Sequence, residues 1–191
     1  MADAIQLDPK TTALVLIDLQ EGIIGMPVAP HSSRDVVARG GKLAARFREL
    51  GAPVVRVRVS FSPTGADALK QPIDATVNFA RAPGWDQLTP AIGSDERDIH
   101  ITKHQWGAFY GTELDLQLRR RRVQTIVIGG ISTNFGVEST ARDAFERSYA
   151  LIFVEDAMSA MTAEAHAFAI TTIFPRLGRV RSTQAVLDAI S

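Results

Sequence analysis

The stretch Thr125–Tyr149, TIVIGGISTNFGVESTARDAFERSY, carries the pattern that decides the fold. Its apolar beginning, Thr125–Ile128, has the composition of a buried parallel strand and runs into the glycine pair Gly129–Gly130. A polar loop follows, and apolar residues then recur at helical spacing: Val137, Ala141, Ala144 and Phe145. The stretch predicts a strand, a tight turn at the glycines and a helix that begins near Gly136. Open α/β sheets bind ligands at such a turn, where the unpaired N–H groups of a helix start point at them.

The rest of the chain repeats this alternation of strands and helices. Further strands are predicted at Thr11–Ile17, Pro53–Ser60, Asp98–Lys103, Val123–Ile128, Leu151–Val154 and around Val180. Helices are predicted from Ser32 or Ser33 to Gly51, after Thr112, over Thr162–Phe174 and from Ser182 onward. The pattern predicts one α/β domain over residues 1–191, a three-layer α/β/α structure with a doubly wound, mostly parallel, six-stranded sheet.

Several local features follow from the same principles. We expect a loop over Gln20–His31, because glycine and proline recur there, and solvent-facing arginines in the PVVRVRVS strand. Asp115 completes a capping-box-like pair with Thr112, and Pro175 ends the preceding helix. The long irregular segment Phe61–Asp98 is typical of a connection that covers a site.

The composition excludes several classes of function. Lysine plus arginine and aspartate plus glutamate both number 21, so the net charge is zero and no positive field attracts nucleic acid or anionic membrane. There is no cysteine, which removes thiol chemistry. No basic segment precedes an apolar run near Met1, and the apolar segments are too short to span a bilayer. We expect a cytoplasmic enzyme or binding protein.

Three residues far apart in the sequence are predicted to meet at one edge of the sheet. Asp18 and Lys103 end two of the strands, and Gly136 lies just beyond the turn after the fourth. Desolvation at Asp18 raises the pKa of its carboxyl unless a cation lies close, and Lys103 would be that cation. Such a pair can serve acid–base catalysis. The alternative is a structural ion pair at the ends of two strands.

Three stretches carry a resemblance to a known family. LVLIDLQ (14–20), ITKHQWGAF (101–109) and GGISTNFGVESTARDA (129–144) together resemble the isochorismatase-like hydrolase superfamily, over roughly Thr11 to Ile190. Most of its members are amide or imide hydrolases with an Asp–Lys–Cys triad. The resemblance implies that Asp18 and Lys103 are the first two members. At the cysteine position this sequence has Gly136.

The resemblance also implies roles for the loop before Gly136. The peptide between Ile131 and Ser132 is commonly cis in the family, and the N–H groups at Ser132 and Gly136 form its oxyanion hole. We therefore expect Ser132, Thr133 and Asn134 to contact substrate. The alternative for Gly136 is that it merely eases entry into the helix. Ser132, Thr133 and Ser139 have no evident base, so a seryl or threonyl nucleophile is not expected.

One branch of the superfamily, the isochorismatases, also carries glycine at this position. It hydrolyses a vinyl ether without a covalent intermediate, and the residue that corresponds to Asp18 is its general acid. Asn134 replaces a histidine common in that branch, so we leave the substrate open. The hypothesis is a non-thiol, acid–base hydrolase of a small metabolite. The alternative is a catalytically inactive member that binds a small molecule or a partner protein.

Neither a metal nor another cofactor is expected. The segment SFSPTGADALKQ lacks the Asp-x-His pair of the nicotinamidase branch. His100 and His104 are four residues apart, but on a strand that spacing covers roughly 13 Å, too far for one ion. Trp106 and Phe109 are core or subunit-contact residues in one interpretation and walls of the substrate pocket in the other. The resemblance implies a homodimer or homotetramer.

Overall fold

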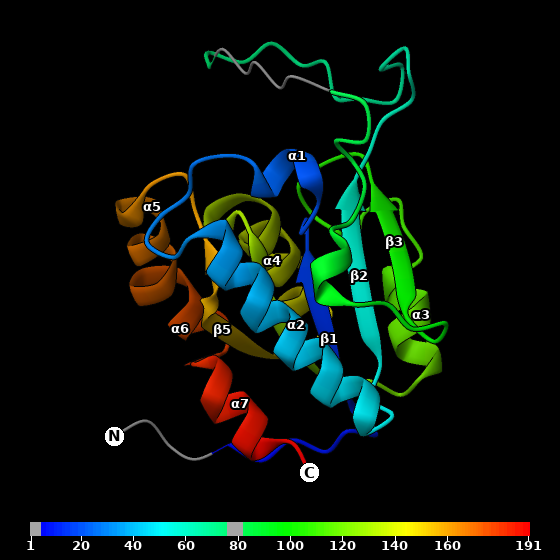
Figure 1. The fold of residues 1–191 in the computed structure, drawn as a ribbon, viewed down its shortest axis with the longest axis vertical. Coiled ribbons are helices and arrows are strands. Elements are labelled where there is room, and N and C mark those ends of the chain that lie inside the picture. The colour runs from blue at the N-terminus through cyan, green and yellow to red at the C-terminus, as the bar shows by residue number, and fades with distance from the viewer. Residues whose placement is uncertain (1–4, 76–81) are drawn as a thin grey trace.

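The computed structural model describes residues 5–75 and 82–191. Its strands are β1 (Thr12–Ile17), β2 (Val54–Val59), β3 (Ile99–Lys103), β4 (Thr125–Ile131), β5 (Ala150–Ser159) and β6 (Arg179–Arg181). The α-helices are α1 (Glu21–Ile24), α2 (Ser33–Glu49), α3 (Leu114–Arg120), α4 (Glu138–Glu146), α5 (Ala163–Phe168), α6 (Phe174–Leu177) and α7 (Thr183–Ala189). A short 3₁₀ turn, η1 (Pro90–Ile92), and two π-helical turns, η2 (Thr133–Val137) and η3 (Ala169–Ile173), complete them (Figure 1).

All six strands pair in parallel, in the order β3-β2-β1-β4-β5-β6. Strands β2 and β3 are added in turn on one side of β1. The chain then crosses to the other side of β1, where β4, β5 and β6 follow in order. This is the doubly wound arrangement, and its switch point lies between β1 and β4. The sequence prediction of a doubly wound, six-stranded α/β sheet is confirmed, and the sheet is parallel throughout.

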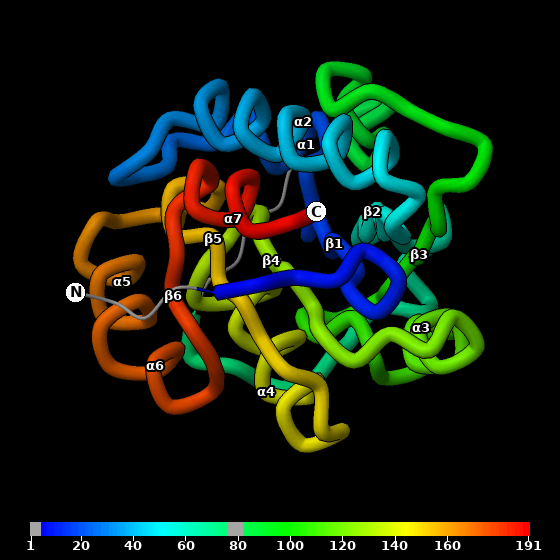
Figure 2. Tube along the Cα trace, turned by 90° about the horizontal axis from the view of Figure 1, so that it is seen from below, coloured from blue at the N-terminus to red at the C-terminus, as the bar shows by residue number. Residues whose placement is uncertain are grey.

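Helices cover both faces of the sheet. Helices α2 and α7 lie on one face, and α3, α4 and α6 lie on the other, as Figure 2 shows from below. The alternate residues of the buried strand β1 serve both layers: Val15 and Ile17 pack in the core under α3 and α4, and Leu14 and Leu16 pack under α2. This produces the predicted three-layer structure.

The helix starts follow the local sequence. The side chain of Ser32 accepts a hydrogen bond from the N–H of Asp35 at the start of α2, and Ser182 accepts one from Ala185 at the start of α7. At α3 the expected capping box is wrong. The Thr112 hydroxyl accepts from the N–H of Leu114, whereas Asp115 accepts a hydrogen bond from Tyr149.

The turn expected at Gly129–Gly130 is also wrong, because β4 continues to Ile131. Both glycines lie inside the strand, where they permit close approach of other segments. A Cβ on Gly130, whose φ is +131°, would lie 2.1 Å from the carbonyl oxygen of Ile17, and one on Gly129 would lie 2.8 Å from that of Ala157. The chain turns at Ser132 instead, and η2 leads directly into α4.

Four further expectations need correction. The Gln20–His31 segment contains the short helix α1. Arg56 is buried, because β2 lies inside the sheet and Asp98 supplies a countercharge. Phe145 is 49% exposed at the last turn of α4. The helical path does not stop before Pro175: η3 leads into α6, where the proline stands in the first turn and its missing N–H costs no hydrogen bond.

Across residues 5–75 and 82–191, no helix has the length and apolar character needed to cross a membrane.

Candidate active site

Asp18 and Lys103 form a buried ion pair at the carboxyl edge of the sheet. Lys103 Nζ lies 2.8 Å from Asp18 Oδ2, and the two side chains are 1% and 8% exposed. Asp18 directly follows β1 and Lys103 ends β3, with β2 between these strands. Neighbouring strands are about 4.8 Å apart, so the lysine side chain reaches across the end of β2 to Asp18.

The Asp18 carboxyl is held in an environment that disfavours its charge. Its backbone has a φ of +53°, a conformation that turns the chain sharply after β1. Oδ1 is buried and, among the described residues, has no hydrogen-bond partner. Burial raises the pKa of Asp18, and the charge and hydrogen bond of Lys103 offset this only in part. An aspartate with a raised pKa can hold a proton for transfer to substrate.

Two further contacts fix the pair. Lys103 Nζ also donates to the carbonyl oxygen of Trp106, at 2.6 Å, which orients the ammonium from the loop after β3. The side chain of the fully buried Gln20 bridges to β2: its Nε2 donates to Val59 O at 3.0 Å, and its Oε1 accepts from Val59 N at 2.9 Å. No role was predicted for Gln20, although it is the last residue of the LVLIDLQ motif.

Gly136 faces both charged groups. A Cβ built at this position would lie 3.0 Å from Asp18 Oδ2 and 3.3 Å from Lys103 Nζ. The carbonyl oxygen of Gly136 accepts a hydrogen bond from the Thr140 hydroxyl at 2.7 Å, which fixes the orientation of its peptide. The structure therefore brings Asp18, Lys103 and Gly136 together, and any side chain at position 136 would project directly onto the ion pair.

The loop between β4 and α4 has the conformation that the resemblance implied. The peptide joining Ile131 and Ser132 is cis. Ser132 Oγ donates to Asn134 Oδ1 at 2.9 Å, so these two side chains pair with each other. Thr133 is fully buried and its Oγ1 lies 2.9 Å from Nδ1 of His166. Burial, with a smaller contribution from the nearby His31, lowers the pKa of His166 to about 4, so its imidazole is neutral near pH 7.

The two aromatic residues after β3 occupy different environments. Trp106 is 63% exposed, and its ring centroid lies 4.9 Å from that of Phe135, the residue before Gly136. Phe109 is 4% exposed and packs in the core against Tyr149, with the Arg147 guanidinium over its ring. These contacts favour the interpretation of Phe109 as a core residue, because its side chain packs in the layer under α3 and α4.

The segment between β2 and β3 runs alongside the residues that follow Asp18. Gly22 N donates to Trp85 O at 2.8 Å, and Thr89 N donates to Leu19 O at 3.0 Å. Its described residues border a cavity of about 360 Å³, lined by residues 61–63 and 82–86. Asp18 and Lys103 do not line this cavity. In Figure 1 the described residues of this segment extend beyond the carboxyl ends of the strands.

Asp156 has a structural role in β5. Its Oδ1 accepts hydrogen bonds from the backbone N–H and the hydroxyl of Thr183, at 2.7 and 2.8 Å, at the start of α7. Its carbonyl oxygen accepts from Arg39 at 2.8 Å. These bonds link β5 to α2 and α7 on the face of the sheet that α2 covers.

A comparison with known proteins identifies the family of this chain. Residues 12–185 match the isochorismatase domain family. The chain is 54% identical to the isochorismatase family protein YecD of Escherichia coli O157:H7, over 97% of this chain and all of that protein. It is 30% identical to the ureidoacrylate amidohydrolase RutB of Methylobacterium radiotolerans, over 98% of this chain and 83% of that protein.

A solved structure gives the same result. An isochorismatase family protein from Burkholderia thailandensis superposes with a TM-score of 0.93 and is 47% identical, and the match covers 98% of each chain. Similarity at this level extends over the whole sheet, both helical layers and the loops that carry Asp18, Lys103 and Gly136. The chain belongs to the isochorismatase family of hydrolases.

Proposed function

We propose that this protein hydrolyses a small metabolite by acid–base catalysis without a covalent intermediate, with Asp18 as the acid–base residue. The single observation that carries the proposal is the buried contact of 2.8 Å between Lys103 Nζ and Asp18 Oδ2 directly beneath Gly136. In a purely structural ion pair, both carboxylate oxygens would be expected to have hydrogen-bond partners. Within the described part of the chain, Asp18 Oδ1 has none. That oxygen is free to carry a proton to substrate.

A vinyl ether is the substrate class that this arrangement suits best. The protonated Asp18 carboxyl transfers its proton to the enol carbon, water adds to the resulting oxocarbenium carbon, and the hemiketal breaks down to a ketone and an alcohol. The added water returns a proton to the Asp18 carboxylate, which completes the cycle. No step requires a sulfur nucleophile, in agreement with glycine at position 136 and with the absence of cysteine from the sequence.

The remaining groups are proposed to bind and orient the substrate. Lys103 holds an anionic group of the substrate and limits the rise in the pKa of Asp18. The backbone N–H groups of Ser132 and Gly136 stabilise negative charge that develops on a substrate oxygen. Thr133 and Asn134 hold this loop in position, and the exposed ring of Trp106 borders the entrance.

An amide or a ureido group is the second candidate substrate. The observation that favours it is the 30% identity to a ureidoacrylate amidohydrolase over nearly the whole chain. Amide hydrolysis at this site would need water as the nucleophile and Asp18 as the general base. It would therefore require the ionised carboxylate, whereas vinyl ether hydrolysis requires the protonated acid.

The test is a screen of vinyl ethers, amides and imides with the wild type and Asp18→Asn. Asp188→Asn, on the exposed face of α7, is the matched control. We expect turnover that falls roughly 10²- to 10⁴-fold in Asp18→Asn and is unchanged in the control, the range typical of lost general acid–base catalysis. Turnover that survives in Asp18→Asn refutes the assignment. Tight metabolite binding without turnover in the wild type indicates a catalytically inactive binding protein instead.

A further inference from the structure

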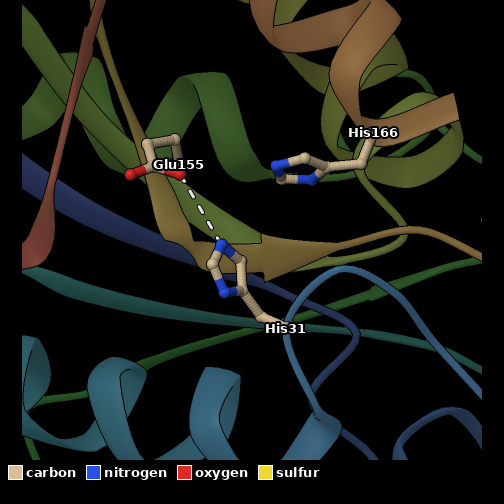
Figure 3. Close-up of side chains that lie close together, drawn as sticks. All are labelled: His31, Glu155 and His166. Carbon is tan, nitrogen blue, oxygen red and sulfur yellow. Dashed lines mark ion pairs between the residues drawn. The ribbon is translucent and has the colours of Figure 1, made fainter. Parts of the chain in front are cut away.

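Two histidines and one glutamate from three separate elements point toward one another, as Figure 3 shows. His31 lies between α1 and α2, Glu155 lies in β5 and His166 lies in α5. Their candidate ligand atoms all lie within 4.8 Å of one another, and His31 Nε2 is 3.6 Å from Glu155 Oε2. This group was not predicted, because its three members are far apart in the sequence and share no short spacing.

The backbone on both sides of the cluster is anchored. The carbonyl oxygen of His31 accepts a hydrogen bond from Ser159 Oγ at 2.8 Å, and Ala29 pairs with Ala160 in an antiparallel bridge. The pairing of β4 with β5 shifts in register beside Glu155, between Ile128 and Gly130. Such a bulge redirects the side chains of the bulged strand. The segments that carry His31 and Glu155 are thus tied together by hydrogen bonds before any ligand arrives.

His166 is oriented as metal-binding histidines usually are. It is 5% exposed, and its Nδ1 lies 2.9 Å from the hydroxyl oxygen of the buried Thr133. If Nδ1 carries the proton and donates to that oxygen, the lone pair of Nε2 is available on the opposite side of the ring. A hydrogen bond of this kind to the second ring nitrogen is found in nearly all histidine ligands of metals.

We propose that His31, Glu155 and His166 form a binding site for one zinc ion. Two imidazoles and one carboxylate are a donor set that suits Zn²⁺, whereas Mg²⁺ and Ca²⁺ prefer oxygen ligands alone. The side chains of His31 and Glu155 are 26% and 37% exposed, which gives the ion access from solvent. Three protein ligands leave a fourth position for water or for an anionic ligand.

The spacing requires only a small adjustment. Ligand atoms that share a tetrahedral zinc lie roughly 3.4 Å apart, given bonds of about 2.1 Å. The His31–Glu155 pair is already near this distance. Since no pair is more than 4.8 Å apart, the widest pair needs to close by at most about 1.4 Å, which rotation of the partly exposed Glu155 and His31 side chains provides. The cluster shares no residue with the Asp18–Lys103 pair, and the Thr133 hydrogen bond connects it to η2.

The experiment measures zinc binding directly. The chelator-treated full chain is titrated with zinc sulfate by calorimetry and with cobalt(II) by visible absorption, which reports tetrahedral coordination. The variants are Glu155→Gln and His31→Ala, whose partly exposed side chains can be changed with little effect on folding. His100→Ala is the matched control, because His100 is an exposed histidine on β3 outside the cluster. None of these readouts depends on turnover, so failure here is distinguishable from failure of the proposed hydrolase activity.

We expect one zinc per chain in the wild type and in His100→Ala, with an increase in Tm on binding. Glu155→Gln and His31→Ala should bind zinc at least about 10-fold more weakly and lose the cobalt absorption. Zinc binding that is unchanged in both cluster variants overturns the proposal. So does a wild type that retains no zinc at micromolar chain concentration, in which case the cluster is only an ion pair beside a buried histidine.

Discussion

Lys103 Nζ lies 2.8 Å from Asp18 Oδ2 although β2 separates the strands that carry the two residues. The lysine spans the carboxyl end of the intervening strand, and both side chains are almost completely buried. Burial of two charges is costly unless each has a close partner, so each residue depends on the other. This dependence leads to predictions about stability as well as activity.

Removal of the Lys103 ammonium should destabilise the fold, because it leaves the Asp18 carboxyl without its partner. Lys103→Met is expected to lower the free energy of unfolding by roughly 3–5 kcal/mol near pH 7, because Asp18 is left buried without a countercharge. The loss should shrink as the pH falls toward the ordinary aspartate pKa of 3.8, and below that value the carboxyl is protonated in both folded and unfolded chains. Urea unfolding at about pH 7 and about pH 5 measures both effects. The double variant with Asp18→Asn should recover part of the loss, and a loss independent of pH with no recovery contradicts the interpretation.

The raised pKa of Asp18 sets the sign of the pH dependence of catalysis. Burial keeps the carboxyl protonated to a higher pH than an ordinary aspartate. If Asp18 is a general acid, kcat/KM should decrease as the pH rises through the pKa of Asp18, because the protonated form is lost. A pH–rate profile of the free enzyme on a vinyl ether substrate measures this limb. A rate that increases with pH through the same range indicates that Asp18 acts as a base.

Position 136 should not tolerate a side chain without loss of activity. A methyl group there meets Asp18 Oδ2 and Ile17 Cγ2 at 3.0 Å, so Gly136→Ala should displace the carboxyl and lower kcat/KM on the order of 10- to 100-fold. Gly40→Ala, within α2, is the matched control. Its methyl group would lie at a similar distance, 3.1 Å, from Cδ1 of Leu19, which is the end of a flexible side chain and can move aside. Steady-state kinetics and thermal unfolding should show lost activity only in the first variant. Equal kinetics in the two variants would contradict the placement of the site beneath Gly136.

The exposed ring of Trp106 should contribute to substrate binding. The ring is 63% exposed and packs against Phe135, the residue before Gly136. Trp106→Ala is expected to raise KM roughly fivefold, equivalent to about 1 kcal/mol, with little change in kcat or Tm, because the main-chain carbonyl that Lys103 contacts is retained. Tyr110→Ala, 77% exposed on the same loop, provides the control. A similar KM in both variants and the wild type means that the ring does not contact substrate.

A second buried charge cluster should affect stability alone. Asp98 accepts two hydrogen bonds from Arg48, at 3.0 and 2.8 Å, and lies 3.8 Å from Nη1 of Arg56. The side chains of Asp98 and Arg56 are 1% and 6% exposed, so Asp98→Ala should cost roughly 3–5 kcal/mol. Arg97→Ala, which removes an exposed ion pair with Asp95, should change stability within experimental error. Chemical denaturation compares the two, and equal losses would show that burial does not set the cost.

Local sequence determined the order and type of most elements. The apolar run before Asp18 specifies β1, and the hydroxyls of Ser32 and Ser182 specify the starts of α2 and α7, because strand burial and helix capping depend on neighbouring residues. The parallel ends of the strands also indicated that Asp18, Lys103 and Gly136 share one edge. These features were predictable since they depend on short-range pattern and on general rules of sheet topology.

Tertiary contacts decided the rest. The sequence contains Gly129 and Gly130 but does not show that β1 and β5 approach them too closely for a Cβ, which keeps them in β4 rather than in a turn. It also shows an arginine at position 56. It does not show that the carboxylate of Asp98, which lies outside β2, approaches this arginine and allows its burial. The meeting of His31, Glu155 and His166, and the bond from Lys103 Nζ to the Trp106 carbonyl, likewise depend on packing between distant segments. Sequence patterns report the preferences of neighbouring residues, whereas distances between side chains from separate elements are fixed only when the layers pack.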